Sequence, residues 1–209
     1  MLFALPLVLG YLLGSCPWGY WLVRIFRGED IRRSGSGNIG GSNVWRTYGA
    51  SLGLPVIVLD VLKGFAPALL GVVTVSHLCG ILAGAAAMLG HWRPLFLRFE
   101  KGGKMVATAT GVLLAVAPWV ALIGAVIWIP TFLLTRYASL ASVLAALSLP
   151  ISVVLLGYPP SVIVFGSLAA AQAAAAPTAA ALSRLSGSSR MVASAPISLN
   201  CSATRNRYS

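Results

Sequence analysis

The sequence is poor in acidic residues and in charge altogether. Only four of its 209 residues are Asp or Glu, charged residues make up 9% of the chain, and hydrophobic residues make up 58%. A soluble domain would carry charge on about a quarter of its residues, so this composition excludes an ordinary soluble protein. The mean hydropathy of +0.88 is typical of a protein embedded in a membrane.

The scarcity of acids and cysteines also limits the chemistry. The acidic residues are Glu29, Asp30, Asp60 and Glu100. The first two are adjacent in the chain, so we expect neither a spaced pair of carboxylates for acid–base catalysis nor a cluster of metal ligands. The three cysteines have no CxxC spacing, which argues against a disulfide framework and a metal site. We therefore expect no metal and no cofactor.

Apolar segments fill most of the sequence up to residue 176. Because about 20 apolar residues cross a bilayer, these segments predict an all-α polytopic membrane protein with about seven transmembrane helices. The expected ranges are 2–23, 50–73, 75–95, 105–117, 119–135, 138–156 and 160–176. The fourth is short, and Pro118 would also allow it to form one kinked span with the fifth. We expect the first segment to be retained rather than cleaved as a signal peptide.

The distribution of basic residues favours seven spans over six. With seven, all of the 15 Lys and Arg residues except Lys63 lie at one face of the membrane. The positive-inside rule makes that face cytoplasmic, with the N-terminus outside and the C-terminus inside. The net charge of +11 is spread over loops and helix ends rather than over one folded polar surface, so we expect membrane lipids and no nucleic acid as partners.

The first polar segment, residues 32–49, reads RRSGSGNIGGSNVWRTYG. Glycine reaches positive φ, so such a run can turn several backbone N–H groups towards one anion, and arginine, hydroxyl and amide groups would add donors. The residues expected to bind are Gly35, Ser36, Gly37, Asn38, Gly40, Ser42, Asn43 and Arg46. A flexible linker is the alternative, although a linker needs no flanking arginines or paired asparagines. The segment does not match a nucleotide-binding glycine motif.

The second polar segment, residues 90–108, reads GHWRPLFLRFEKGGKMVAT and falls on the same predicted face, where it can meet the first. Gly102, Gly103 and Lys104 directly precede a predicted helix, whose free N–H groups favour an anion, and Lys101 adds a second charge. The alternative is that these lysines snorkel towards lipid phosphates. His91 is either a hydrogen-bonding residue of the structure or a catalytic base.

Two charged residues fall inside the second predicted span. Asp60 and Lys63 stand three apart, which predicts an intrahelical ion pair that lowers the cost of charge in the membrane. The loops, rich in donors and cations but poor in bases, suit reactants that are already anionic and activated, as in acyl or phosphoryl transfer. A carrier or channel for small phosphorylated anions is the alternative, although the sequence shows no inverted repeat.

Five motifs carry a family resemblance. They are GSCPWGYWLVR (14–24), DIRRSGSGNIGGSNVWRTYG (30–49), LDVLKG (59–64), GHWRPLFLRFEKGGKMVAT (90–108) and RYASLAS (136–142). In order and spacing they resemble the bacterial acyl-phosphate:glycerol-3-phosphate acyltransferase family. The resemblance implies a seven-span enzyme of the bacterial inner membrane, with its active site facing the cytoplasm. It would move a fatty acyl group from acyl phosphate to the sn-1 hydroxyl of glycerol 3-phosphate, giving lysophosphatidic acid for phospholipid biosynthesis.

The resemblance also implies residue roles. The glycine-rich loop with Arg46 would cradle the glycerol phosphate, and Lys104 with its preceding glycines would hold a phosphate of donor or acceptor. Ser139 and Ser142 of RYASLAS would line the cleft. The candidate catalytic residues are Ser36, Asn38, His91 and Lys104. We expect direct transfer in one step, without an acyl-enzyme.

This chain departs from the family pattern in three places. Ser42 stands where the family reads GATN, Glu100 looks inserted, and Met105 replaces a glycine, which would narrow the approach to Lys104. After the last span the family carries a motif close to H-R-x-N-I, whereas residues 177–209 are rich in Ala, Ser and Arg and contain no His. We expect a membrane domain over 1–176 and an atypical tail over 177–209, disordered or read out of frame. If that tail is genuine, the site lacks those side chains and the activity of this copy is in question.

Overall fold

The computed structural model describes residues 3–169 and residue 171. All regular elements in this part of the chain are helices. They are α1 (Ala4–Gly14), α2 (Trp18–Arg27), α3 (Gly41–Tyr48), α4 (Ala50–Thr74), α5 (His77–Trp92), α6 (Val106–Val116), α7 (Pro118–Thr135) and α8 (Ala138–Leu155), with short 3-10 turns η1 (Ile31–Arg33) and η2 (Leu95–Leu97). A further apolar helix covers Pro160–Ala169. The predicted all-helical class is confirmed for the described residues.

Three of these helices, α4, α7 and α8, are long and apolar enough to cross a membrane. The helices α6 and Pro160–Ala169 are apolar but shorter. These elements agree with a membrane protein, while the count of seven spans and the orientation of the termini stay predictions. The alternative of one kinked helix around Pro118 is wrong: α6 ends at Val116 and α7 begins at Pro118, because Ala117 leaves the helical conformation with φ −152° and ψ 69°.

The expectation of a single first helix over 2–23 is also wrong. α1 ends at Gly14, and α2 begins at Trp18 after Pro17, which has no N–H to continue a helical ladder. α2 differs from α1 in its side chains, because α2 carries basic residues in its last turn and exposes Ile25 and Phe26. A helix with apolar side chains beside basic ones is typical of a membrane surface rather than of a span.

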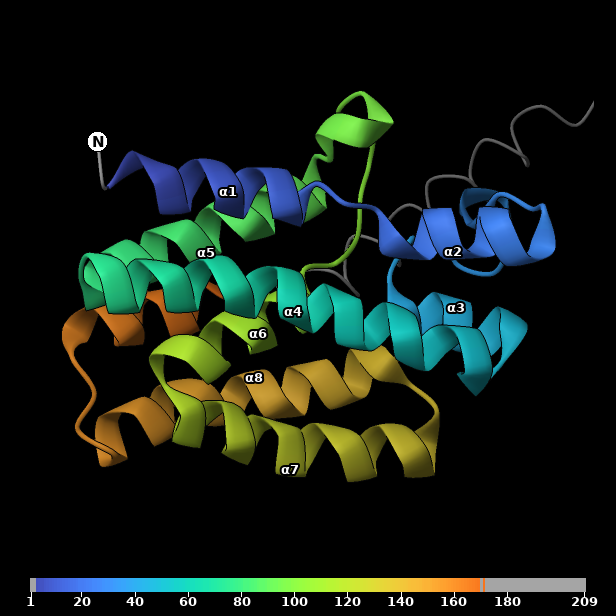
Figure 1. The fold of residues 1–209 in the computed structure, drawn as a ribbon. Coiled ribbons are helices and arrows are strands. Elements are labelled where there is room, and N and C mark those ends of the chain that lie inside the picture. The colour runs from blue at the N-terminus through green and yellow to red at the C-terminus, as the bar shows by residue number, and fades with distance from the viewer. Residues whose placement is uncertain (1–2, 170, 172–209) are drawn as a thin grey trace, which may run out of the picture. The chain divides into compact units, whose positions relative to one another are not determined.

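α4 lies at the centre of the packing and contacts α1, α3, α5 and α6, and α7 lies beside α8 (Figure 1). Glycines allow the helices to approach closely. A Cβ on Gly64 of α4 would overlap with the backbone of Thr108 in α6, and one on Gly71 would overlap with the backbone of Gly80 in α5. Small residues at such contacts are the usual solution in membranes, where van der Waals packing replaces the hydrophobic driving force.

A small apolar cluster lies under the polar loops and joins elements that are far apart in the sequence. Its buried members are Val23, Ile31, Ile39, Val44, Leu52, Val56 and Leu97. They come from α2, η1, the glycine-rich loop, α3, α4 and η2, so the cluster fixes both polar segments against the end of α4. A second, larger cluster joins α4, α5, α6, α7, α8 and the Pro160–Ala169 helix.

Candidate functional site

Asn43, in the first turn of α3, organises the glycine-rich loop. Its side chain is buried; Oδ1 accepts a hydrogen bond from the Ser36 N–H at 2.9 Å, and Nδ2 donates to the carbonyls of Ser34 and Asn38 at 3.1 and 2.9 Å. Gly35 adopts φ +60°, and a Cβ there would overlap with Oδ1 of Asn43. The loop is therefore held in one conformation by an amide, which argues against a flexible linker. Substrate contact by Asn43 stays a prediction.

The loop leads directly into α3. Asn38 accepts a hydrogen bond from the Gly40 N–H at 2.7 Å, and Gly40 is the N-cap of α3. Ser36 and Arg46 are exposed and Ser42 is half-buried. The exposed donors of this segment thus belong to side chains on a braced loop and a short helix, an arrangement that presents N–H and hydroxyl groups together.

The second polar segment is anchored to the end of α5. Gly102 donates its N–H to the carbonyl of Trp92 at 2.9 Å, and Gly103 donates to that of His91 at 3.0 Å. Lys104 follows Gly103, and its side chain is exposed. The surrounding protein nevertheless displaces part of the water around its ammonium group. That partial burial, and then the nearby charges of Arg46 and Lys101, lower the pKa of Lys104. The charge of Arg46 therefore acts on Lys104, although the two residues come from different polar segments.

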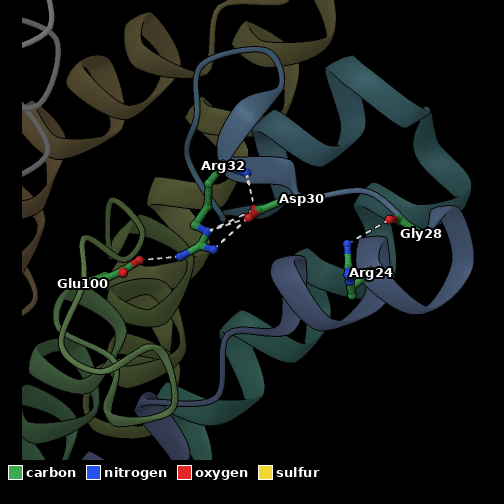
Figure 2. Close-up of polar contacts among 5 residues, drawn as sticks. All are labelled: Arg24, Gly28, Asp30, Arg32 and Glu100. Atoms are coloured by element: carbon green, nitrogen blue, oxygen red, sulfur yellow. Dashed lines mark hydrogen bonds and ion pairs between the residues drawn. The ribbon is translucent and has the colours of Figure 1, made fainter.

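Arg32 joins the same two segments by a direct contact (Figure 2). It binds Asp30 with Nη2 and Oδ2 2.7 Å apart, and through Nη1 it contacts the carboxylate of Glu100. The hydrogen bond from Arg32 lowers the pKa of Asp30. The guanidinium also lies over the Tyr20 ring at 4.9 Å. The expectation that the two segments meet is confirmed, and Glu100, which looked like an insertion, supplies part of the link.

A separate pocket of about 500 Å³ opens beside α2. It is lined by Tyr20, Arg24, Gly28, Glu29, Asp30, Arg33 and Ser34. The Arg24 guanidinium donates to the Gly28 carbonyl at 3.0 Å and closes the turn after α2 (Figure 2). None of the site residues expected from the sequence lines this pocket.

Ser139 and Ser142 lie near the start of α8. The Ser142 hydroxyl is buried, donates to the carbonyl of Ala138 at 2.7 Å and accepts from Nε1 of Trp128 at 3.1 Å. Trp128 stacks on Phe132 with ring centroids 4.9 Å apart, and Phe132 meets the edge of Trp45 at 5.6 Å. An aromatic stack thus joins Ser142 to α3, next to Arg46.

His91, Asp60 and Lys63 form a buried group between α4 and α5. The predicted ion pair is confirmed, with Lys63 Nζ 2.7 Å from Asp60 Oδ1. Lys63 also donates to the carbonyl of Cys16 at 2.9 Å, and His91 Nδ1 lies 3.7 Å from Asp60 Oδ1. His91 is only 3% exposed. Across residues 3–169, no group of three or more His, Cys, Asp and Glu side chains is placed to hold a metal.

Comparison with known proteins identifies the family of this chain. The family model described as glycerol-3-phosphate acyltransferase matches residues 4–186. The chain belongs to this family. Its relatives include a glycerol-3-phosphate acyltransferase of Desulforamulus reducens, 44% identical over 77% of this chain and 80% of the relative. Another, from Aquifex aeolicus, is 44% identical over 77% of this chain and 86% of the relative.

Solved structures agree with this membership. The chain is similar to the crystal structure of PlsY (YgiH), an integral membrane glycerol 3-phosphate acyltransferase, in its glycerol 3-phosphate form. The TM-score is 0.79 and the identity 38%, over 88% of this chain and 92% of that chain. The lysophosphatidic acid form of the same protein gives a TM-score of 0.73. Membership of this enzyme family does not favour the carrier or channel alternative.

Within this acyltransferase, sequence reasoning missed the aromatic stack. Trp128 and Phe132 are four residues apart and therefore share a face of α7, a spacing visible in the sequence. The third ring of the stack belongs to Trp45, which stands next to Arg46 in the sequence. The tail predicted for residues 177–209 lies outside the described residues, so the division at 176 and the out-of-frame hypothesis stay predictions.

Proposed function

We propose that this chain transfers a fatty acyl group from acyl phosphate to the sn-1 hydroxyl of glycerol 3-phosphate and releases lysophosphatidic acid for phospholipid biosynthesis. The observation that carries the proposal is the meeting of the two polar segments through Arg32 and Glu100, in a chain of the glycerol-3-phosphate acyltransferase family. Arg46 lies on one segment and Lys104 on the other, and a phosphate bound near both would offset the repulsion between their charges. Both substrates carry such a group.

In the proposed site, each polar segment binds the phosphate of one substrate. The glycine-rich loop and Arg46 hold the phosphate of glycerol 3-phosphate, because an arginine fork and backbone N–H groups suit phosphate oxygens. Lys104 holds the phosphate of the donor. Ser36 and Asn38 position the glycerol hydroxyls, since Asn38 uses its amide oxygen for Gly40 and keeps its nitrogen as a donor. Ser139 and Ser142 lie beside the cleft at the start of α8.

The reaction proceeds in one step. The sn-1 oxygen attacks the acyl carbonyl carbon, the bond from that carbon to the phosphate oxygen breaks, and inorganic phosphate leaves with the bonding electrons. A substrate phosphate accepts the hydroxyl proton. The protein contributes positioning and stabilisation of negative charge, which together can supply most of the rate enhancement. The leaving phosphate is already stable, so no strong base is needed.

The site faces the cytoplasm of a bacterial inner membrane. The support is the gathering of basic residues at one predicted face and the exposed Ile25 and Phe26 beside Arg24 and Arg27 on α2. Such a helix lies in the headgroup layer, where basic side chains bind anionic lipids. The acyl donor would enter from that layer, and glycerol 3-phosphate would enter from water.

The test is product formation by the purified full chain in detergent. We expect lysophosphatidic acid, identified by mass spectrometry, from acyl phosphate and glycerol 3-phosphate, and no product when an acyl thioester replaces acyl phosphate. Lys104→Met should reduce the rate strongly. The Aquifex aeolicus relative serves as the positive control. If that relative forms product under the same conditions and this chain forms none, the proposal fails.

A further inference from the structure

The buried group formed by Asp60, Lys63 and His91 has no part in the chemistry described so far. Asp60 and Lys63 are 2% and 4% exposed, and Lys63 also joins α4 to the link between α1 and α2 through the Cys16 carbonyl. A buried ion pair costs several kcal/mol of desolvation per ion and often stabilises a fold no better than apolar side chains of similar volume. Stability alone therefore explains the group poorly, and its contacts with other elements become informative.

His91 is the member of this group that contacts the second polar segment. Its Nδ1 lies 3.7 Å from Asp60 Oδ1, and its ring packs directly against the backbone of Gly103. A Cβ on Gly103 would overlap with Nε2, Cε1 and Cδ2 of that ring. Only glycine fits at this position while the imidazole stays in place.

Two backbone hydrogen bonds complete the contact. Gly103 and Gly102 donate to the carbonyls of His91 and Trp92 at 3.0 and 2.9 Å. The end of α5 therefore holds both glycines, by ring contact and by hydrogen bonds, directly before Lys104. Because Lys104 directly follows Gly103, a His91 ring in another position would shift the backbone from which the Lys104 side chain extends.

We propose that Asp60, Lys63 and His91 form a positioning group that sets the place of Lys104 through the backbone of Gly102 and Gly103. His91 is then a positioning residue and not a catalytic base, because its side chain is enclosed and its ring lies against the backbone of Gly103. Displacement of a substrate-binding group by about 1 Å can cost about a hundredfold in rate. This inference rests on the proposed function, since it assigns Lys104 its role there.

The test uses steady-state kinetics of the full chain in detergent, with kcat and KM for each substrate measured across pH. For His91→Gln we expect kcat/KM to fall about tenfold to a hundredfold, with a pH profile of unchanged shape. A catalytic base would instead lose the limb of the profile that reports its titration. Asp60→Asn, which keeps the side-chain volume, should give a smaller loss of the same kind.

A double substitution separates positioning from general damage. Gly103→Ala should lower kcat/KM strongly, because its Cβ displaces the His91 ring or the backbone. His91→Ala removes the ring, so Gly103→Ala combined with His91→Ala should be more active than Gly103→Ala alone. His77→Gln is the matched control: this second histidine lies at the other end of α5, where Nε2 is 2.9 Å from the Val116 carbonyl. It should keep wild-type kinetics.

The outcomes separate this inference from the proposed function. If the wild-type chain forms no lysophosphatidic acid, the proposed function fails. If the wild type is active, and His91→Gln and Asp60→Asn both keep its kinetics while Lys104→Met is impaired, only the positioning role fails. A changed pH profile in His91→Gln, or strictly multiplicative effects of Gly103→Ala and His91→Ala, would also overturn it. Should His91→Gln not fold, Asp60→Asn and the Gly103 comparison decide.

Discussion

Arg46 lies in the last turn of α3, and its side chain is exposed. It is close enough to Lys104 to contribute to the lowered pKa of that lysine. A planar fork of donors at this place matches two oxygens of one phosphate, whereas an ammonium group offers a single point charge.

Arg46→Lys should therefore weaken the use of glycerol 3-phosphate. Loss of a charge-assisted bond costs about 1.5–3 kcal/mol, equivalent to roughly ten- to more than a hundredfold in kcat/KM. The KM for acyl phosphate should barely change. Arg27→Lys, at the end of α2, is the control and should match the wild type. If Arg46→Lys shows wild-type kinetics in membranes at equal expression, Arg46 is only a positively charged anchor.

The backbone conformation of Met105 is unfavourable for a residue with a side chain. It is buried and adopts φ +61°, in the left-handed region where a side chain costs about 1–2 kcal/mol and glycine costs little. The family glycine at this position is thereby explained. We expect Met105→Gly to be more stable than Met105→Ala by about 1 kcal/mol, measured as thermal midpoints in detergent. In α6 the order should reverse, with Ala109→Gly less stable than the wild type. Equal midpoints for the two Met105 variants would contradict this account.

At the scale of elements, the close contact between α4 and α6 depends on Gly64. Gly64→Ala should lower the thermal midpoint, because its Cβ would overlap with the Thr108 carbonyl and force the helices apart, at a cost of about 1–3 kcal/mol. Gly124→Ala in α7 is the control. Its Cβ would lie 3.7 Å from Leu149, an ordinary contact, so helix propensity should leave the midpoint unchanged or raise it. A Gly64→Ala protein as stable as Gly124→Ala would show that the helices are not so closely packed.

The apolar helices α4 to α8 were predictable, and the short helices α2 and α3 were not. α4, α7 and α8 fall within one residue of the predicted 50–73, 119–135 and 138–156, and Gly49, Pro118 and Arg136 mark boundaries that the sequence shows. α3 begins with Gly41, Ser42 and Asn43, which are weak helix formers. Tertiary contacts form it: Gly41 packs against Ile57, and Trp45 packs against Gly53. No local pattern carries that information.

The candidate site was also predictable only in part. The glycine-rich loop and the segment before Lys104 were visible because glycine, serine and basic residues stand out between apolar segments. What each side chain does there was not visible. The sequence did not show that the amide of Asn43 braces the loop, or that Arg32 contacts Asp30 and Glu100. Burial and orientation decide these roles, and both depend on distant residues.

At the scale of the whole molecule, the fold brings together two polar segments, 32–49 and 90–108, that forty residues separate in the sequence. The contact from Arg32 to Glu100 and the proximity of Arg46 to Lys104 join them. In the proposed mechanism each segment holds one phosphate, so both substrates are bound at once and the acyl group is not transferred to the protein. Direct transfer between bound substrates is the central claim of this account.

Initial-rate kinetics with both substrates varied test that claim most directly. Rates measured in detergent over a grid of acyl phosphate and glycerol 3-phosphate concentrations should give intersecting double-reciprocal lines, because both substrates must bind before product forms. An acyl-enzyme would release phosphate first and give parallel lines. Parallel lines, with an acyl group trapped on Ser36, Ser15 or Cys16, would contradict the account.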